Sequence, residues 1–470
     1  MMRCNRFLSR GALVLSGKSG WMGWGCATLG VVLAAAGCGR ASPAQDAAHE
    51  ATEDMAATDP EGASDGGPPI TAAENQPAPL ADASGNSAGS PEPAPCECAT
   101  SDALQAIGCG SGQAFRNPVA ISDDGATIAF DACPDDAVCR GYHWSAEQGS
   151  QALPATSIGS GVTGLSPDGE LVLISPSADT FGAEALVYRT SDGRTVRTGL
   201  RPEPLALSAE GSVVGLAFDT PSVQLARWSE ETGRELLGEL PAASRPALVS
   251  SPDSAVIFGT FEGPRGGKPF RWTPEDGLVQ GVEGIPELSP DPQLTLSRDG
   301  STLFGYRPAA DGTPSAFRWT ESDGATDLGL PGTANASAIA ASADGSIIAI
   351  SQQLEPNPQC GPGTLCSGAL RWTNAAGTEE LTSGTPSIAS TISSQGTRIL
   401  GTAGRFSPSL FEWTAGRGAR NVQLALEAAG VDATGWQLFS ADAVSSDGKV
   451  MVGRATCGVT STVVRIVLPD

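Results

Sequence analysis

The tetrapeptide Ser166-Pro167-Asp168-Gly169, followed at once by the apolar run 171–175, is one of eight related copies in this chain. Most copies have the form Ser, any residue, an acidic residue and Gly, and each leads into a strand-like run. Successive first serines are 44, 42, 43, 46, 45, 51 and 52 residues apart. A period in this range is typical of four-stranded propeller blades. The copies begin at Ser122, Ser166, Ser208, Ser251, Ser297, Ser342, Ser393 and Ser445.

One repeat divides naturally into strands. After the turn at Ser208, residues 212–216 form an apolar strand, and a variable loop leads to residues 223–228. Alternation in this third segment puts every second side chain on one face. Residues 234–240 complete the unit. We therefore predict an all-β fold, a β-propeller of eight blades, with seven blades as the alternative. Helical periodicity in the repeat region is confined to a short stretch around 422–429.

An aromatic residue recurs in the third strand of seven repeats, often after an arginine. A ring of such residues could stack on a ligand. Packing is the favoured interpretation, because one large aromatic side chain per blade fills the gap between neighbouring sheets. The positions are Trp144, Tyr188, Trp228, Trp272, Trp319, Trp372 and Trp413, with Ile466 near the equivalent place in the last repeat.

The two ends of the repeat region complement each other. The last repeat stops without a fourth strand, whereas residues 103–108 form an apolar segment ahead of the first repeat. Pairing this segment with residues 463–468 would close the ring and remove exposed sheet edges. Cys109 and Cys457 would then lie in the closing blade and could cross-link it. In the seven-bladed alternative, residues 103–125 lie outside the ring.

The N-terminal segment is typical of an export signal. Four basic residues precede an apolar, small-residue run at 21–37, which ends in Ala35-Ala36-Gly37-Cys38. These small residues before a cysteine resemble a bacterial lipobox. We expect a signal peptide over 1–37, lipid on Cys38, and attachment to the cell envelope, with the outer membrane favoured. A plain cleaved signal is the alternative; the run is shorter than a membrane span.

Residues 38–95 are expected to be a disordered acidic tether. Ala, Pro, Gly, Ser, Asp and Glu dominate them, and they contain no aromatic residue. Such a composition cannot bury enough apolar surface to offset the entropy of ordering. The predicted propeller then occupies residues 96–470.

The charge of the chain excludes some partners. The whole sequence has a formal net charge of −24, and loss of four basic residues with the signal leaves −28. Nucleic acid and anionic lipid surfaces both require Lys and Arg. We expect no nucleic-acid partner, contact with the membrane through the lipid alone, and a monomer.

The remaining cysteines are expected to form disulfides, because an even number of them is left in an exported chain. Cys133 and Cys139 bracket one short loop, and Cys360 and Cys366 bracket another, so each pair is predicted to be local. The pairing of Cys96 and Cys98 is left open. A zinc site is disfavoured, because the only histidines are His49 and His143 and no CxxC pair exists.

Motifs that carry chemistry are missing from the expected propeller. The expected propeller, residues 96–470, contains no Gly-x-Ser-x-Gly, no Walker-type loop and no His-Glu-x-x-His; the two Gly-x-Ser-x-Gly stretches of the chain, 62–66 and 85–89, lie in the expected tether. His143 lies beside Trp144 in an expected strand, which favours a core role. The recurring acidic residues could suggest calcium, but each is in a separate turn, and calcium takes six to eight oxygens. We therefore predict no catalytic residue, no metal site and no cofactor.

The repeats resemble those of the HAF-repeat extracellular proteins. The resemblance rests on Ala316-Phe317-Arg318-Trp319-Thr320, on residues 327–332, and on 435–448, and extends by pattern over about 110–470. The family's His-Ala-Phe triplet survives here only as Ala-Phe or Pro-Phe. The Ser-Pro-Asp-Gly turn is also similar to repeats of WD-type and TolB-type propellers. The resemblance implies an exported propeller-like protein without an assigned activity.

Loops between second and third strands vary most and carry both local cysteine pairs. Variable loops on a rigid scaffold are where binding usually resides. The sequence therefore suggests a binding or protein-interaction scaffold at the cell envelope, without catalysis, for an unknown protein or glycan ligand. A glycan-acting hydrolase or lyase and an envelope assembly factor are the alternatives. The loops are 131–141, 175–184, 260–268, 306–315 and 351–368.

Overall fold

The computed structural model describes most of the repeat region. The described residues are 100–110, 120–132, 140–154, 161–176, 183–202, 205–217, 222–241, 247–263, 266–285, 287–288, 294–308, 314–330, 336–354, 366–404, 407–458 and 460–470. The chain divides into Met1–Glu74 and Asn75–Asp470, and the first unit lies wholly outside the described residues. The predicted signal, the lipid on Cys38 and the tether therefore stay predictions. None of the helices among the described residues is both long and apolar enough to cross a membrane.

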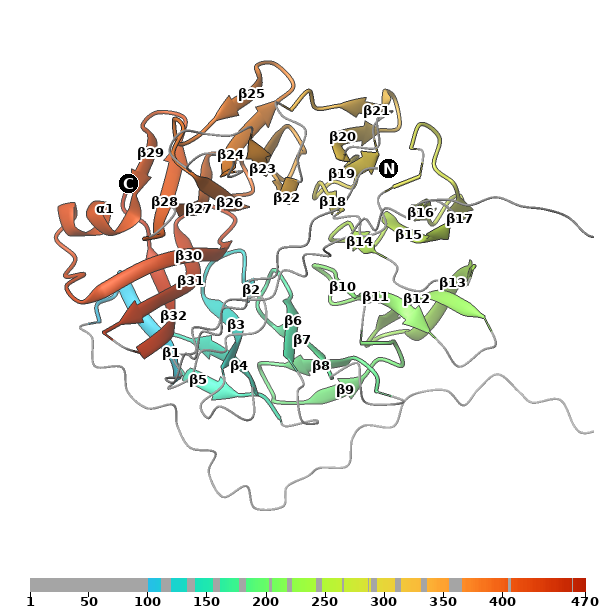
Figure 1. The fold of residues 1–470 in the computed structure, drawn as a ribbon. Helices are drawn as coiled ribbons and strands as arrows, with labels where there is room; N and C mark the ends of the chain where they lie inside the picture. The colour runs from blue at the N-terminus through green and yellow to red at the C-terminus, as the bar shows by residue number, and fades with distance from the viewer. Residues whose placement is uncertain are drawn as a thin grey trace, which may run out of the picture. The chain divides into compact units, whose positions relative to one another are not determined.

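The described residues form eight four-stranded antiparallel sheets, arranged in a ring (Figure 1). The prediction of an eight-bladed propeller is confirmed, and the seven-bladed alternative is wrong. Each blade runs from an inner to an outer strand in chain order. Blades 1 to 4 consist of β2 (Ala120–Ile121), β3 (Thr127–Ala132), β4 (Arg140–Ser145) and β5 (Gly149–Ala152); β6 (Gly161–Leu165), β7 (Leu171–Ser175), β8 (Leu186–Arg189) and β9 (Thr195–Arg197); β10 (Ala206–Leu207), β11 (Val213–Ala217), β12 (Val223–Ser229) and β13 (Gly233–Leu240); β14 (Leu248–Ser250), β15 (Ile257–Gly263), β16 (Gly266–Thr273) and β17 (Gly277–Gln280).

The second half of the ring repeats this order and ends in a blade of mixed origin. Its last sheet has the order β1-β32-β31-β30, so the most N-terminal strand lies outermost. β1 (Leu104–Gly110) pairs antiparallel with β32, with Leu104 opposite Ile466. Blades 5 to 8 contain β18 (Thr295–Leu296), β19 (Thr302–Pro308), β20 (Pro314–Thr320) and β21 (Gly324–Asp327); β22 (Ala336–Ala341), β23 (Ile347–Leu354), β24 (Cys366–Thr373) and β25 (Gly377–Glu380); β26 (Ser387–Ile392), β27 (Arg398–Ala403), β28 (Ser409–Thr414) and β29 (Gly418–Asn421); β30 (Trp436–Val444), β31 (Val450–Cys457) and β32 (Thr460–Val467).

A short helix, α1 (Val422–Ala428), follows the outer strand of blade 7 where the sequence shows helical periodicity. Asn421 caps it by accepting a hydrogen bond from the Leu424 N–H. Such a cap satisfies one of the amides that a helix start leaves unpaired. The buried Val422 and Leu426 then hold the helix against blades 7 and 8.

The recurring tetrapeptide forms the turn between the first and second strands. In six copies the serine hydroxyl donates to the Asp Oδ1 at 2.5–2.8 Å. The same oxygen accepts the N–H two residues later at 2.9–3.0 Å. In Asp124 these bonds, chiefly that from Ser122, hold the pKa below its ordinary value. The acidic residue is thus used in forming its own turn, which is the role that the sequence favoured over calcium binding.

The turn glycine is required twice over. At Gly211 the φ angle is +79°, a region that side-chain-bearing residues rarely adopt. A Cβ there would also lie 2.5 Å from the Leu171 Cδ1 of the preceding blade. Gly396 repeats both features, with φ +68° and Ile347 Cδ1 at 2.5 Å. The turn therefore sets both its own shape and the spacing between blades.

The recurring aromatic residues pack between blades, as the sequence favoured. All of them are buried, and Trp228 is only 2% exposed. The arginine before the aromatic of one blade lies over the indole of the next: Arg227 over Trp272, Arg371 over Trp413, and Arg465 over Trp144, at 5.1–5.5 Å from the ring centroid. Such cation–π contacts add to the burial of the aromatic surface. The last of them joins blade 8 to blade 1.

Candidate functional site

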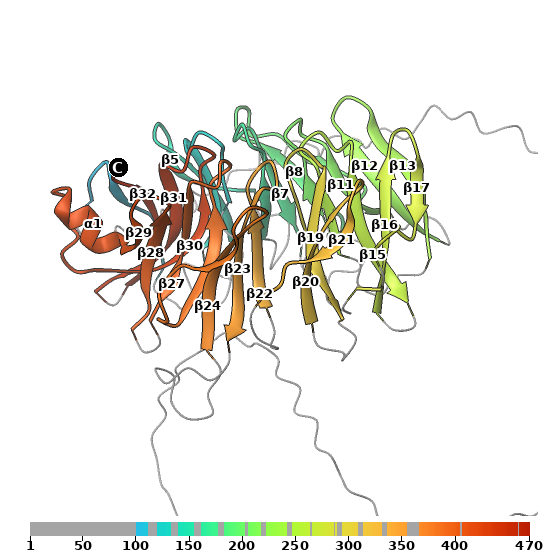
Figure 2. The same ribbon diagram turned by 90° about the horizontal axis from the view of Figure 1, so that it is seen from above.

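The strands run between two faces of the propeller (Figure 2). One face carries the turns between first and second strands together with the hairpins between third and fourth strands, and we call it the turn face. The other carries the loops between second and third strands and the links between blades, and we call it the loop face.

The loop face is the surface that the sequence singled out, and much of it falls outside the described residues. Segments 133–139, 177–182, 309–313 and 355–365 belong to this part. Cys133, Cys139, Cys360 and the side chain of Cys366 lie outside as well, so both local disulfides stay predictions. Cys457 is disulfide-bonded. The Cys109 side chain is not among those described, and the Cys109–Cys457 pairing therefore also stays a prediction.

The eight turns form a ring of backbone hydrogen bonds at the centre of the turn face. In six of the eight neighbouring pairs, an N–H of one turn donates to the carbonyl of the next turn's second residue, at 2.6–3.3 Å. The hydrogen bond from the Ser446 N–H to the Asp123 carbonyl joins the last repeat to the first. The two remaining junctions have Pro167 and Pro252 in the donor position, and proline has no N–H. The sequence thus decides where the ring is interrupted.

Arg298 reaches across this ring. It is the second residue of the blade 5 turn, and its guanidinium donates to Asp123 Oδ2 of blade 1 at 2.6 Å and to Ser446 Oγ of blade 8 at 3.2 Å. Ser446 Oγ also donates to Asp123 Oδ1 at 2.7 Å, and Ser394 Oγ lies 2.9 Å from it. Four blades are therefore joined by side chains at the mouth of the central channel.

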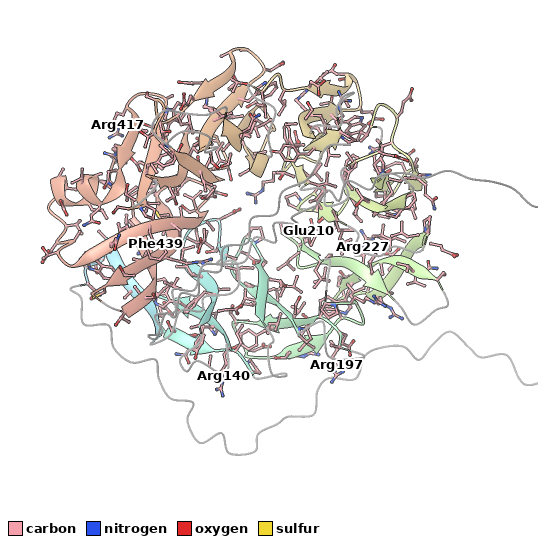
Figure 3. The ribbon with its side chains drawn as sticks, in the orientation of Figure 1. Arg140, Arg197, Glu210, Arg227, Arg417 and Phe439 are labelled. Carbon is pink, nitrogen blue, oxygen red and sulfur yellow. The ribbon has the colours of Figure 1, made fainter. Side chains whose placement is uncertain are left out.

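The charge is distributed unevenly over the propeller. Figure 3 shows Glu210, the acidic residue of the third turn, at the inner end of blade 3. By contrast, Arg140, Arg197 and Arg417 lie toward the outer rim. Arg298 is thus a cation among the acidic turns at the centre.

A groove of about 420 Å³ lies between blades 6 and 7. This volume is within the range of small-molecule sites. Its floor is one face of the blade 7 sheet: Phe411 and Trp413 on β28 alternate with side chains that point to the other face, as the two-residue period of a strand requires. Ala419 and Asn421 on β29 are their cross-strand partners and complete the floor.

The opposite wall of the groove comes from blade 6 and its link to blade 7. It contains Glu379 and Glu380, both exposed, and the segment 381–385. Glu380 Oε1 accepts the Gly384 N–H at 2.7 Å and so fixes the link. Ser383 in the link has φ +50°, a strained conformation for a residue with a side chain. Strained residues of this kind cluster at functional sites.

The groove presents hydroxyl, amide and carboxylate groups over an aromatic floor. Thr382, Ser383, Thr385, Ser409 and Asn421 line it along with the two glutamates. Arg420 also borders it, but its guanidinium binds Glu412 and the Pro469 carbonyl toward blade 8. The side chains that this groove offers to a ligand are therefore neutral or negative.

His143 lies in the core, as expected from its place beside Trp144. It is 3% exposed, and its Nε2 lies 3.5 Å from the Tyr188 hydroxyl of blade 2. Burial lowers the pKa of His143 below its ordinary value of 6.5. The imidazole is thus kept neutral between two blades, where it supports their packing.

This burial predicts a dependence of stability on pH. Because the folded pKa lies below the unfolded value, the unfolded chain binds the proton first as the pH falls through 6.5. Stability should decline between pH 7 and 5 with a slope of at most about 1.4 kcal/mol per pH unit from this group. The free energy of unfolding of His143→Gln, measured in urea, should lack this part of the pH dependence. His49→Gln, which replaces the other histidine, should keep it; equal slopes in both variants would contradict the assignment.

Asp442 is a partly buried carboxyl that the sequence did not single out. It lies at a bulge in β30, the inner strand of blade 8, and its Oδ2 accepts from Arg454 Nε at 3.1 Å. Burial raises its pKa, and Arg454 opposes this effect. Among the described residues, no group of three or more His, Cys, Asp or Glu side chains is placed to hold a metal ion.

Comparison with known proteins finds distant structural similarities only. No family model and no curated protein matches the sequence. Solved structures with a similar fold include TolB from Acinetobacter baumannii, with 14% identity and a TM-score of 0.35 over 63% of this chain and 79% of that one. Prolyl oligopeptidase B from Galerina marginata has 10% identity and a TM-score of 0.47 over 72% and 55%. An oligogalacturonate lyase, solved in complex with manganese, has 12% and 0.44 over 78% and 93%.

These similarities correct the hypothesis drawn from the sequence. A binding or protein-interaction scaffold without catalysis was expected, yet the similar propellers include those of a peptidase and a lyase. The comparisons therefore give no support to a scaffold role or to an absence of catalysis. The match spans only about half of the peptidase. The resemblance to HAF-repeat proteins stays a prediction.

Proposed function

We propose that the propeller recognises a small hydroxyl-rich ligand, a neutral or amino-bearing saccharide, in the groove between blades 6 and 7. The observation that carries the proposal is the groove itself: a volume of about 420 Å³ lined by hydroxyl, amide and carboxylate groups, above the nearly buried Phe411 and Trp413. This is recognition of a small molecule at the side of the ring. The groove adjoins the link 381–385 of the loop face, and binding of a small molecule there differs in kind from assembly with a protein.

The chemistry of the lining selects the ligand class. Ser383, Thr385 and Ser409 supply hydroxyls, and Asn421 has an amide N–H₂ left after its oxygen caps α1. Hydroxyl-rich ligands match such donors and acceptors, since a polar group left unpaired in a binding site costs affinity. Glu379 is paired with Arg371, so the exposed carboxylate of Glu380 is the group that disfavours an acidic ligand and favours an amino group.

The register of blade 7 supplies a sharp test. Ala419 is exposed and lies directly opposite Trp413, so a tryptophan at this position would fill the groove. Ala415 is equally exposed but lies in the preceding hairpin, outside the groove. Calorimetric titration with neutral, amino and acidic oligosaccharides should show binding of the first two classes. Ala419→Trp should weaken it by at least about tenfold, a loss of about 1.4 kcal/mol.

Ala415→Trp is the matched control and should bind as the parent does. The circular dichroism spectrum of both variants should match that of the parent, since both positions are exposed. Absence of binding by every saccharide class would overturn the proposal. Binding that survives in Ala419→Trp would place the ligand elsewhere on the propeller.

A further inference from the structure

We propose that Arg298 is a latch that closes the central channel at the turn face. The residue extends from blade 5 to blades 8 and 1 and bonds both the Asp123 carboxylate and the Ser446 hydroxyl. This inference is independent of the groove between blades 6 and 7.

The ring of turns is narrow enough for one arginine side chain to span it. Hydrogen-bonded chain segments lie about 4.8 Å apart, so a ring of eight has a diameter of roughly 12 Å between backbones. The backbone atoms themselves fill part of that width. An extended arginine meeting an aspartate from the other side therefore spans the opening, as the 2.6 Å contact between Arg298 Nη2 and Asp123 Oδ2 shows.

The two partners of Arg298 are also held in place by hydrogen bonds to each other. Both oxygens of Asp123 are used, one by Arg298 and one by Ser446. The Asp123 and Ser446 backbones are joined by the ring bond between blades 8 and 1. A guanidinium suits this arrangement because its planar fork can donate to two oxygens at once. Lysine, with one compact ammonium group, would not reproduce both contacts.

The latch is built to open as well as to close. The side chains of Arg298 and Asp123 are 38% and 42% exposed, and ion pairs with this exposure contribute little to stability. The turn ring is interrupted at Pro167 and at Pro252, and the second gap adjoins blade 5 itself. Arg298 can therefore leave without unfolding the turns around it.

The test measures access to the inner strands beside the mouth. Ser250 ends β14 directly before the blade 4 turn and is half-buried. Ile388 lies on β26 nearer the loop face and is 44% exposed. Each is replaced by cysteine, Ser250→Cys or Ile388→Cys, with and without Arg298→Ala. The rate of reaction with a methanethiosulfonate that carries a trimethylammonium group is then measured, with the chain lacking the added cysteine as baseline.

Arg298→Ala should accelerate the reaction of Ser250→Cys by about tenfold and change that of Ile388→Cys by less than about twofold, since only the turn-face mouth opens. Arg298→Lys and Asp123→Asn should give intermediate rates at Ser250→Cys, because each keeps part of the network. An unchanged rate at Ser250→Cys would overturn the proposal. Equal acceleration at both positions would overturn it too, because it would mean that the ring had loosened as a whole.

Discussion

Removal of residues 1–110 is expected to destabilise the propeller severely, whereas removal of residues 1–95 is expected to leave its unfolding midpoint nearly unchanged. The longer truncation deletes β1, the outer strand of blade 8, and the shorter one retains it. Leu104 and Ile107 on this strand are 0% and 4% exposed. Their burial alone contributes about 3–6 kcal/mol, at about 1.5–3 kcal/mol for each side chain.

Loss of β1 also changes the remaining blade. β32 would become an edge strand with the sequence TSTVVRIV, an apolar and β-branched edge of the kind that promotes aggregation. Contacts that link β1 to its surroundings would be lost as well, among them Thr462 Oγ1 to the Gly108 carbonyl at 2.7 Å. We therefore expect insolubility or a broad, early transition for the longer truncation.

Thermal unfolding and size-exclusion chromatography of the two truncated chains measure the difference. Both are compared with and without a reductant, so that loss of a disulfide at Cys457 is separated from loss of the strand. A soluble protein lacking residues 1–110, with the midpoint of the parent under reducing conditions, would show that β1 is dispensable.

The blade pattern could be predicted from sequence because its determinants are local. The Ser and Asp of each turn bond within six residues of each other, and the turn glycine is required by its own φ angle. Such features recur with the period of the repeat and need no knowledge of distant parts. The same locality explains why α1 and the buried position of His143 could be expected from the residues around them.

Arg298 could not be found in this way. Its partner Asp123 is 175 residues away and lies across the channel, so only the closed ring brings the two together. Nothing in the tetrapeptide Ser297-Arg298-Asp299-Gly300 distinguishes the residue from any other variable second position. The groove between blades 6 and 7 could not be predicted from the sequence either, because its two walls belong to different repeats and its size depends on how closely these repeats pack.

Blade 7 departs from the repeat at the position before the recurring aromatic residue. The residue before the aromatic position is arginine in blades 3 to 6 and in blade 8, where Ile466 replaces the aromatic, but it is Glu412 in blade 7. The cross-strand partner of Glu412 is Arg420. In blade 6 the arginine, Arg371, is on the third strand and the glutamate, Glu379, is on the fourth, so the two charges have exchanged strands in blade 7. The exchange coincides with Ile466 in place of tryptophan in blade 8. An arginine at position 412 would therefore have no indole to cover in the next blade.

In blade 7 the glutamate is buried and pairs with two arginines. Glu412 is 1% exposed and bonds Arg420 Nε, while Arg398 Nε lies 3.6 Å from its other oxygen. Arg398 also donates to the Gly448 carbonyl at 2.8 Å, and Arg420 to the Pro469 carbonyl at 2.7 Å. This network ties blade 7 to the last blade and to the C-terminal residues.

Glu412→Ala is therefore expected to cost about 3–5 kcal/mol in the free energy of unfolding, the loss typical of a buried charge pair broken on one side. The substitution leaves Arg398 and Arg420 together without a counter-charge. Arg420→Ala should cost clearly less, because it removes one of two arginines and leaves Glu412 paired with Arg398. Breaking the exposed Arg371–Glu379 pair of blade 6 by Glu379→Ala should cost no more than about 1 kcal/mol. Urea unfolding of the three variants tests this order; a loss for Glu412→Ala as small as that for Glu379→Ala would show that the buried network does not hold the last two blades together.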